Sequence, residues 1–422
     1  MKATLKIYLV IWILVYFFGA IAPGSSLFSI ESKIITIFLT TIYLFLSILA
    51  FLGLYYNKPL YFIKPLRKLD YNLTISFLAI CSLVGILCFI YDKTIIQGID
   101  YSQGLAKARY QFIDNAAERE GISSIFSVLG YFLGAYCFTG LYLLLVFWDK
   151  VKVKRRILFF CIFILGIFII SLLTGGRTSV ILIVTIFFTS YIIRKGWGLK
   201  AWPFSKAFGK IIIIISLIVF IYLIFIFSQR ADATNSLAEF YAEKMFDWMQ
   251  VKTNERFSLI NKLPDSFQSS FFFLSILWIY LVHSNWIFEG IIQLNDFSGQ
   301  AVFVNYRNIL SKFGIVDTPQ EWIFSGRFIT WVGGIYHDFG IGGLIVCAIL
   351  HGGIMGYSLK MILHNKGSFD PLNFLFFFLT FSISITSPFI IVIDVLMFPS
   401  ILVSFVMFAI FMYIKSKIKF KI

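Results

Sequence analysis

The chain has 422 residues, of which 59% are hydrophobic and 14% charged, and its formal net charge is +15. Such a composition lies far from that of soluble globular proteins and indicates a membrane protein. The five cysteines all fall within apolar stretches, so the sequence suggests neither a disulfide framework nor a metal site.

Apolar stretches of membrane-spanning length recur along the whole chain. They show no alternation of the kind that barrel strands have, and only helices or closed barrels satisfy the backbone in lipid. We therefore predict an all-α polytopic membrane protein with about ten transmembrane helices, or eleven to twelve as the alternative. The predicted spans are 5–22, 34–56, 72–91, 125–148, 157–173, 178–193, 211–228, 340–359, 372–393 and 396–414.

A further apolar run, 271–290, is interrupted by His283, Asn285 and Glu289, and we expect it to dip into the membrane or lie along it. The long outer loop would then contain short or re-entrant helices. Three parts are predicted: a seven-span bundle (1–228) with an outer segment (92–124), a large outer loop (229–338), and a three-span bundle with a basic tail (339–422).

Lysine and arginine set the predicted orientation. Alternate short loops and both termini hold 22 of the 36 basic residues, accompanied only by Asp70, Asp149 and Asp370. By the positive-inside rule these segments face the cytoplasm, which requires an even number of crossings. The basic surface suits anionic membrane lipid, and we predict no nucleic-acid partner.

One arginine lies between two uncharged apolar runs, in the hairpin Thr174–Ser179. An arginine at such a depth is costly unless a polar or anionic group receives it. Gly175 and Gly176 allow a tight turn and leave room for a ligand, and Thr178 follows. Arg177 is therefore predicted to bind an anion on the outer side.

The outer loop holds arginines and tryptophans, residue types that suit phosphates and sugar rings. The alternative for any one of them is an interfacial aromatic belt with anchoring cations. These residues are Arg230, Arg256, Arg307, Arg327, Trp278, Trp286, Trp322 and Trp331, with Arg109 as a secondary candidate in the 92–124 segment.

A polar triplet, Tyr336-His337-Asp338, precedes the glycine-rich late span. His337 or Asp338 could accept a proton from an attacking hydroxyl. Asp338 could instead cap the next helix, with Gly340 in its first turn. By contrast, His351 lies deep in that span, and we interpret it as an imidazole bonded to a neighbouring helix. The glycines around it favour close helix packing.

The segments LLTGGRTS and GGIYHDFGIGG, separated by a long outer loop, resemble the bacterial oligosaccharide repeat unit polymerases (the Wzy-type O-antigen and capsule polymerases). The match rests on Gly175, Gly176, Arg177 and Thr178 and on Asp338, Phe339 and Gly340. The paired outer-loop motifs of arginine, ten residues and glycine that some of these polymerases carry are missing here.

The resemblance implies a polymerase in the bacterial plasma (inner) membrane that joins repeat units carried on undecaprenyl diphosphate, for lipopolysaccharide, capsule or exopolysaccharide biosynthesis. Arg177, Arg230 and Arg327 would bind the diphosphate, His337 or Asp338 would activate the acceptor hydroxyl, and Trp322 and Trp331 would hold sugars. No cofactor or metal would be needed. A chain-length regulator and a flippase would be its partners. An O-antigen ligase and, further off, a lipid-linked oligosaccharide flippase are the alternatives.

Overall fold

The computed structural model describes residues 1–57, 70–117, 122–174, 178–203, 224–225, 227–232, 236–295, 301–317, 323–324, 326–394 and 397–417. Most of the predicted span at 211–228 lies outside these residues, as do Gly175, Gly176, Arg177 and Trp322.

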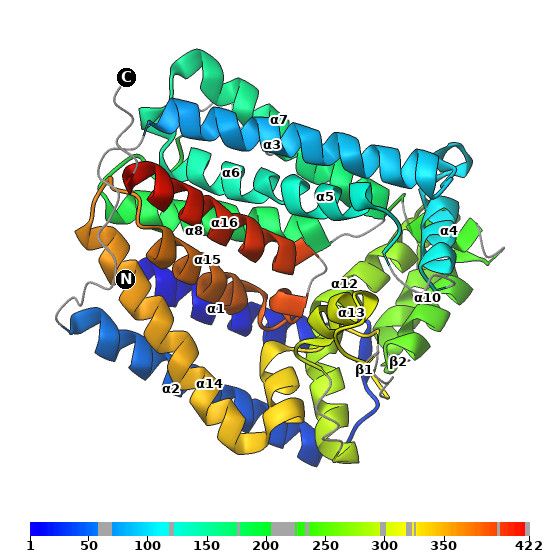
Figure 1. Ribbon diagram of the computed structural model, residues 1–422. Coiled ribbons are helices and arrows are strands. Elements are labelled where there is room, and N and C mark those ends of the chain that lie inside the picture. Colours follow the sequence, from blue (N-terminus) through cyan, green and yellow to red (C-terminus); the bar gives the residue numbers. More distant parts are fainter. Residues whose placement is uncertain are drawn as a thin grey trace.

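The described residues form helices almost throughout, which confirms the all-α prediction (Figure 1). One small antiparallel pair of strands, β1 (Gly24–Ser26) and β2 (Val251–Thr253), is added to them. The α-helices are α1 (Lys2–Ala20), α2 (Ile30–Tyr56), α3 (Tyr71–Tyr91), α4 (Leu105–Ala117), α5 (Ile125–Gly134), α6 (Tyr136–Val146), α7 (Val153–Thr174), α8 (Thr178–Gly196), α10 (Ala238–Trp248), α11 (Glu255–Ser258), α12 (Asp265–Leu294), α13 (Val304–Lys312), α14 (Trp331–His364), α15 (Pro371–Thr386) and α16 (Met397–Lys417).

Within the described residues, eight helical segments are long and apolar enough to cross a membrane. Seven coincide with predicted spans: α1, α2, α3, the α5–α6 pair, α7, α14 and α16. The eighth is α12, which covers the run at 271–290. The predicted spans at 178–193 and 372–393 form α8, of 19 residues, and the shorter α15, of 16. The protein is thus a polytopic helical membrane protein, and the number ten stays a prediction.

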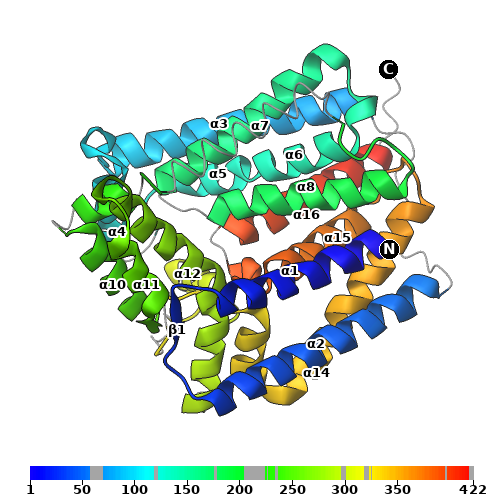
Figure 2. The same cartoon turned by 180° about the vertical axis from the view of Figure 1, so that it is seen from behind.

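The bundle has two distinct ends. Helix α1 begins and α16 ends at the same end, on the left in Figure 1 and on the right in Figure 2. Helices α4, α10, α12 and α13, which belong to the two predicted outer segments, gather at the opposite end. We call these the inner and outer ends of the bundle, following the predicted orientation.

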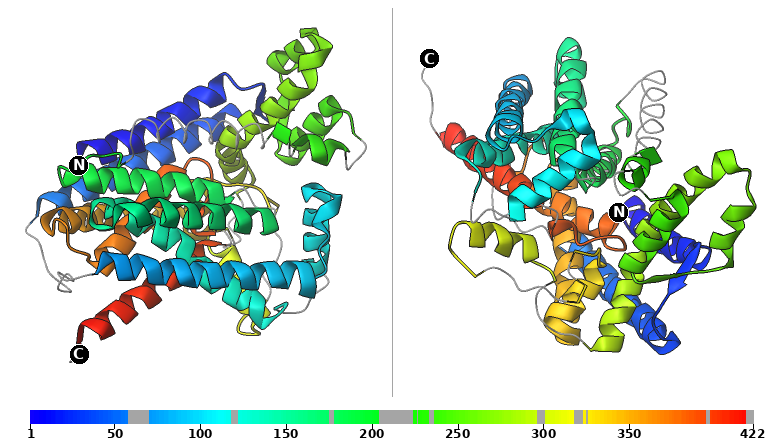
Figure 3. Two further views of the ribbon diagram at one scale, coloured as in Figure 1. Left: turned by 90° about the horizontal axis from the view of Figure 1, so that it is seen from above. Right: turned by 90° about the vertical axis from the view of Figure 1, so that its right-hand side faces the viewer.

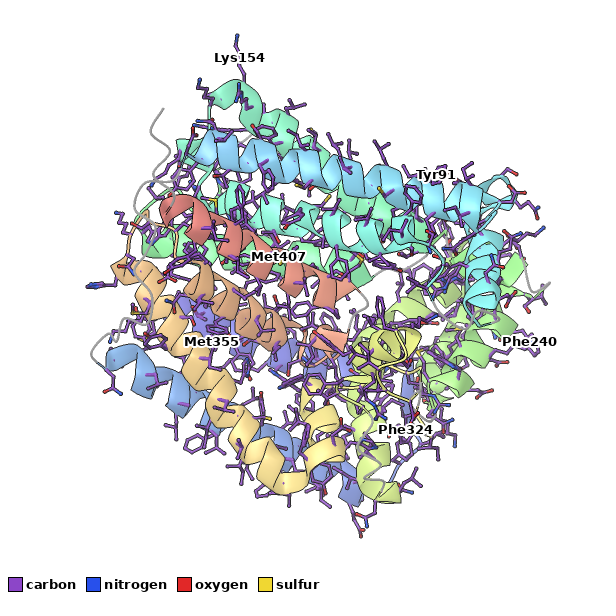
Figure 4. The ribbon with its side chains drawn as sticks, viewed as in Figure 1. Tyr91, Lys154, Phe240, Phe324, Met355 and Met407 are labelled. Atoms are coloured by element: carbon purple, nitrogen blue, oxygen red, sulfur yellow. The ribbon has the colours of Figure 1, made fainter. Side chains whose placement is uncertain are left out.

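Polar contacts join the helix termini at the inner end. Arg194 is buried, and its guanidinium donates to the carbonyl oxygens of Leu145, Val146 and Lys200 and to Asp149 Oδ2 at 2.7 Å. The start of α7 is tied to α3 through a bond from the Lys152 amide to Asn72 Oδ1. Basic residues remain exposed here, and Lys154 projects from the start of α7 (Figure 4).

Helices α2 and α14 pack closely because glycines of α14 face the backbone of α2. A Cβ atom on Gly352 would collide with the carbonyl oxygen of Ser47, and one on Gly356 with that of Phe51. The predicted small-residue packing is therefore confirmed. His351, directly before Gly352, bonds to α2 and α15 through Tyr43 Oη and the Thr380 carbonyl oxygen, both at 2.9 Å, which confirms the predicted bond to a neighbouring helix.

The outer segments form a cap with a hydrophobic core of its own. Residues from α10, β2, α11 and α12 bury one another in it, among them Phe246, Met249, Phe257 and Ile276. Helix α12 runs across the direction of α1 and α8 in Figures 1 and 2. The right-hand view of Figure 3, which looks along the bundle from its outer end, shows α12 from the side. The predicted outer loop is thus a packed layer on the bundle.

Candidate functional site

The segment 92–124 is attached to the outer ends of α3 and α7. The buried Asp92 carboxylate accepts the hydroxyls of Ser123 and Ser124, at 2.8 and 2.6 Å. Tyr101 donates its hydroxyl to the carbonyl oxygen of Leu173 at 2.9 Å, next to Thr174, where α7 ends. The hairpin that contains Arg177 therefore starts beside this segment, while Arg177 itself lies outside the described residues.

Arg109 and Arg230 come together from separate parts of the chain. Arg109 lies in α4, and the helical residues 227–232 carry Arg230. The two guanidinium groups are close enough to act on one another, and Tyr280 of α12 also acts on Arg109. Burial, and then the charge of Arg230, lower the pKa of Arg109. The secondary candidate of the sequence and one of the primary candidates thus lie in one place.

Arg327, in the segment before α14, also lies near α12. Its Nε donates to the Trp248 carbonyl oxygen at 2.5 Å and its Nη1 to that of Ile323 at 2.7 Å. Burial lowers the pKa of Arg327. The guanidinium is close enough to His283 to interact with it electrostatically. We call Arg109, Arg230 and Arg327, which lie near Tyr280 and His283 of α12, the arginine cluster.

Three aromatic rings pack against one another near these arginines. The centroids of Tyr280, His283 and Phe328 are 5.6 to 5.8 Å apart, and Phe227, three residues before Arg230, lies 5.9 Å from Tyr280. Figure 4 labels Phe324, over whose ring the Arg327 guanidinium lies at 5.7 Å, in this outer part of the molecule. Such a surface offers planar rings beside cations, which suits a sugar next to a phosphate.

Sequence reasoning did not assign Tyr280, His283 and Phe328 to the site. The available signal was the polar interruption of the apolar run 271–290. This run forms most of α12, which runs across the bundle. Some of its residues belong to the cap core, while Tyr280 and His283 lie near the arginines. Ser284 and Asn285, from the same interruption, bond to the carbonyl oxygen of Pro388 and tie α12 to the end of α15.

His337 and Asp338 form a buried pair on α14, with Nδ1 and Oδ1 2.6 Å apart. The Asp338 carboxylate also accepts the backbone amides of Ala301 and Val302, at 2.8 and 2.7 Å. It therefore fixes the chain before α13. Asp338 does not cap the helix as the alternative interpretation had it, because α14 begins earlier and is capped by the Thr330 hydroxyl.

The helix α14 changes direction at Gly340, whose φ of +62° and ψ of −162° suit glycine alone. The part before it starts inside the bundle. Trp331 is buried, and its indole donates to Tyr43 Oη at 2.7 Å, the same hydroxyl that meets His351. Residues 331–339 therefore form a short first arm of α14, which is set off from the rest of the helix at Gly340. Trp331 belongs to the core and is no longer a candidate for sugar contact, and half-buried Tyr336 packs against Phe288.

Among the described residues, no three His, Cys, Asp or Glu side chains lie together in a way that could hold a metal ion. The absence of a metal or cofactor from the reaction stays a prediction. Comparison with protein-family models, with curated proteins and with solved structures finds no match to this chain.

Proposed function

We propose that this protein is a glycosyltransferase that joins oligosaccharide repeat units carried on undecaprenyl diphosphate, at the outer face of the bacterial plasma membrane. The resemblance of its sequence motifs to the repeat unit polymerases suggests this reaction. The observation that supports it most is the arginine cluster, which brings Arg109, Arg230 and Arg327 to the outer end of the bundle around α12.

Neighbouring arginines favour an anion. An anion that binds beside the Arg109 and Arg230 guanidinium groups is attracted by both charges, and the attraction is stronger in a partly buried site than in water. Arginine binds phosphate oxygens through two parallel hydrogen bonds, so a diphosphate can engage two or three of these side chains at once. Arg177 would join them from the hairpin beside Tyr101.

In the proposed reaction a hydroxyl of the acceptor repeat attacks the anomeric carbon of the donor glycan. The bond from that carbon to the diphosphate oxygen breaks, and the lipid diphosphate leaves with the electron pair. Fixed guanidinium groups stabilise the charge on this leaving group. The rings of Tyr280 and Phe328 provide apolar faces for the sugars. A base must take the hydroxyl proton, and His337, oriented by Asp338, has been the expected one.

The test is the surface glycan of a strain from which the gene for this chain is deleted. We expect the ladder of long chains on a gel to collapse to a single repeat, and the full-length protein to restore it. Loss of all glycan from its anchor would instead indicate a ligase or a flippase. An unchanged ladder would contradict all three.

The arginine cluster can be tested in the same strain. Arg230→Gln should fail to restore long chains, because a neutral amide cannot neutralise the leaving diphosphate. Lys262→Gln removes an exposed cation from the same cap and is the matched control, which should restore the ladder fully.

A further inference from the structure

The structure contains a second histidine suited to proton transfer, and it lies in the arginine cluster. His283 is completely buried in α12. Its Nδ1 lies 3.1 Å from the carbonyl oxygen of Ile279, one helical turn earlier. Since a carbonyl oxygen can only accept, Nδ1 must carry the hydrogen, and Nε2 therefore carries the lone pair.

This lone pair is unused within the part of the chain that the structure describes. Nε2 is buried, and no hydrogen-bond donor among those residues reaches it. A buried acceptor without a donor costs about 1–3 kcal/mol, so its retention needs a reason. The contrast with His351 is informative, since both nitrogens of that imidazole are engaged by neighbouring helices.

The surroundings of His283 match those that the proposed reaction needs. The ring lies beside Tyr280 and Phe328, the two aromatic faces proposed for sugars. The guanidinium of Arg327 is within electrostatic reach of it, and Tyr280 is in turn within electrostatic reach of Arg109, which is near Arg230. A group that accepts a proton here would do so next to the cations that hold the departing diphosphate.

We infer that His283, rather than His337, is the general base that activates the acceptor hydroxyl, an inference that rests on the proposed function. The hydroxyl proton moves to Nε2 as the oxygen bonds to the anomeric carbon and the lipid diphosphate departs. The imidazolium then returns the proton to water. A hydroxyl reaches Nε2 once a side chain packed near the ring turns aside, and half-buried Phe328, whose ring centroid lies 5.8 Å from that of His283, is such a side chain.

The role of His337 differs because its Nδ1 meets Asp338, which also holds the amides of residues 301 and 302. That arrangement joins α14 to the chain before α13. His337 is then a positioning residue. Its removal affects activity only by changing how the chain before α13 packs on α14.

His283→Asn is the sharpest test. The asparagine amide nitrogen can take the place of Nδ1 and still donate to the Ile279 carbonyl oxygen, while nothing replaces Nε2. With the purified full-length protein and lipid-linked repeats, we expect kcat to fall about 100-fold or more. We expect KM for the donor to change less than about twofold, because the arginines remain. His364→Gln, an exposed histidine at the inner end, is the matched control and should leave both constants unchanged.

The outcomes separate the two hypotheses. Wild-type protein that does not extend lipid-linked repeats contradicts the proposed function, and the base assignment with it. Wild-type extension together with a normal kcat in His283→Asn overturns the base assignment alone. If His283→Asn does not fold, judged by its thermal transition in detergent, His337→Asn decides. A folded His337→Asn with kcat within about fivefold of wild type supports His283, and a 100-fold loss returns the role to His337.

Discussion

The two ends of the bundle use arginine in opposite ways. At the inner end, Arg194 is enclosed by acceptors, namely three backbone carbonyl oxygens and Asp149. At the outer end, burial lowers the pKa of Arg109, and the charge of nearby Arg230 lowers it further. The first arrangement ties helix ends together, whereas the second brings two cations within electrostatic reach of one another, which favours the binding of an anion.

The largest effect on the fold is expected from Arg194→Gln. It leaves buried carbonyl oxygens without donors, and we expect the free energy of unfolding to fall by about 3–5 kcal/mol. This is a large share of the total free energy of unfolding of a typical protein. Protein abundance in membranes and the thermal transition in detergent measure it. Lys195→Gln, at the exposed neighbouring position, should change neither. A stable Arg194→Gln protein would remove the distinction between the two ends.

The double variant Arg109→Gln, Arg230→Gln should show the converse behaviour. Each lost charge-assisted hydrogen bond to a diphosphate is worth about 2 kcal/mol, so the loss of two such bonds should reduce chain extension roughly 1,000-fold. Mutual repulsion of the two cations is removed at the same time, so the thermal transition should fall less than in Arg194→Gln. Normal extension in a stable double variant would exclude the cluster as the diphosphate site.

Arg177→Lys sharpens the comparison further, because it keeps the charge and removes the fork of donors. We expect single repeats to accumulate, with membrane insertion intact, since a lysine cannot bind two phosphate oxygens in parallel. Gel analysis of surface glycan and immunoblotting of membranes measure the two properties. Glycan chains of normal length in this variant would show that Arg177 does not act through paired hydrogen bonds to phosphate.

The smallest effect is expected from Tyr101→Phe. This change removes one hydrogen bond, to the Leu173 carbonyl oxygen, and should cost about 1 kcal/mol at most. If this bond positions the hairpin, chain extension should fall several-fold with unchanged abundance. Tyr110→Phe, on an exposed ring of the same segment, is the control. Equal activity of the two variants would show that the hairpin is held by other contacts.

Hydropathy and charge were sufficient to predict the helical membrane class, most of the spans and the two polar segments. These properties depend on the local cost of placing a side chain in lipid. The role of His351 and the glycine packing were also predictable, because a polar group inside a span needs a helix neighbour and small residues allow close approach.

The sequence predicted which residue types form the site, but it did not predict which of these residues lie near one another. The sequence named Arg109, Arg230 and Arg327, which are separated by more than 90 residues along the chain, but local patterns do not show that such residues meet. The burial of Trp331 was not predicted, because its environment depends on the kink at Gly340 and on the packing of the start of α14 against Tyr43 of α2.

The sequence by itself thus determined which segments enter the membrane, because transfer into lipid is a property of each segment. Only the tertiary structure decided that Arg109 and Arg230 lie near one another and that His283 lies near Arg327. Those distinctions depend on distances between residues far apart in the chain, and the transverse packing of α12 sets these distances.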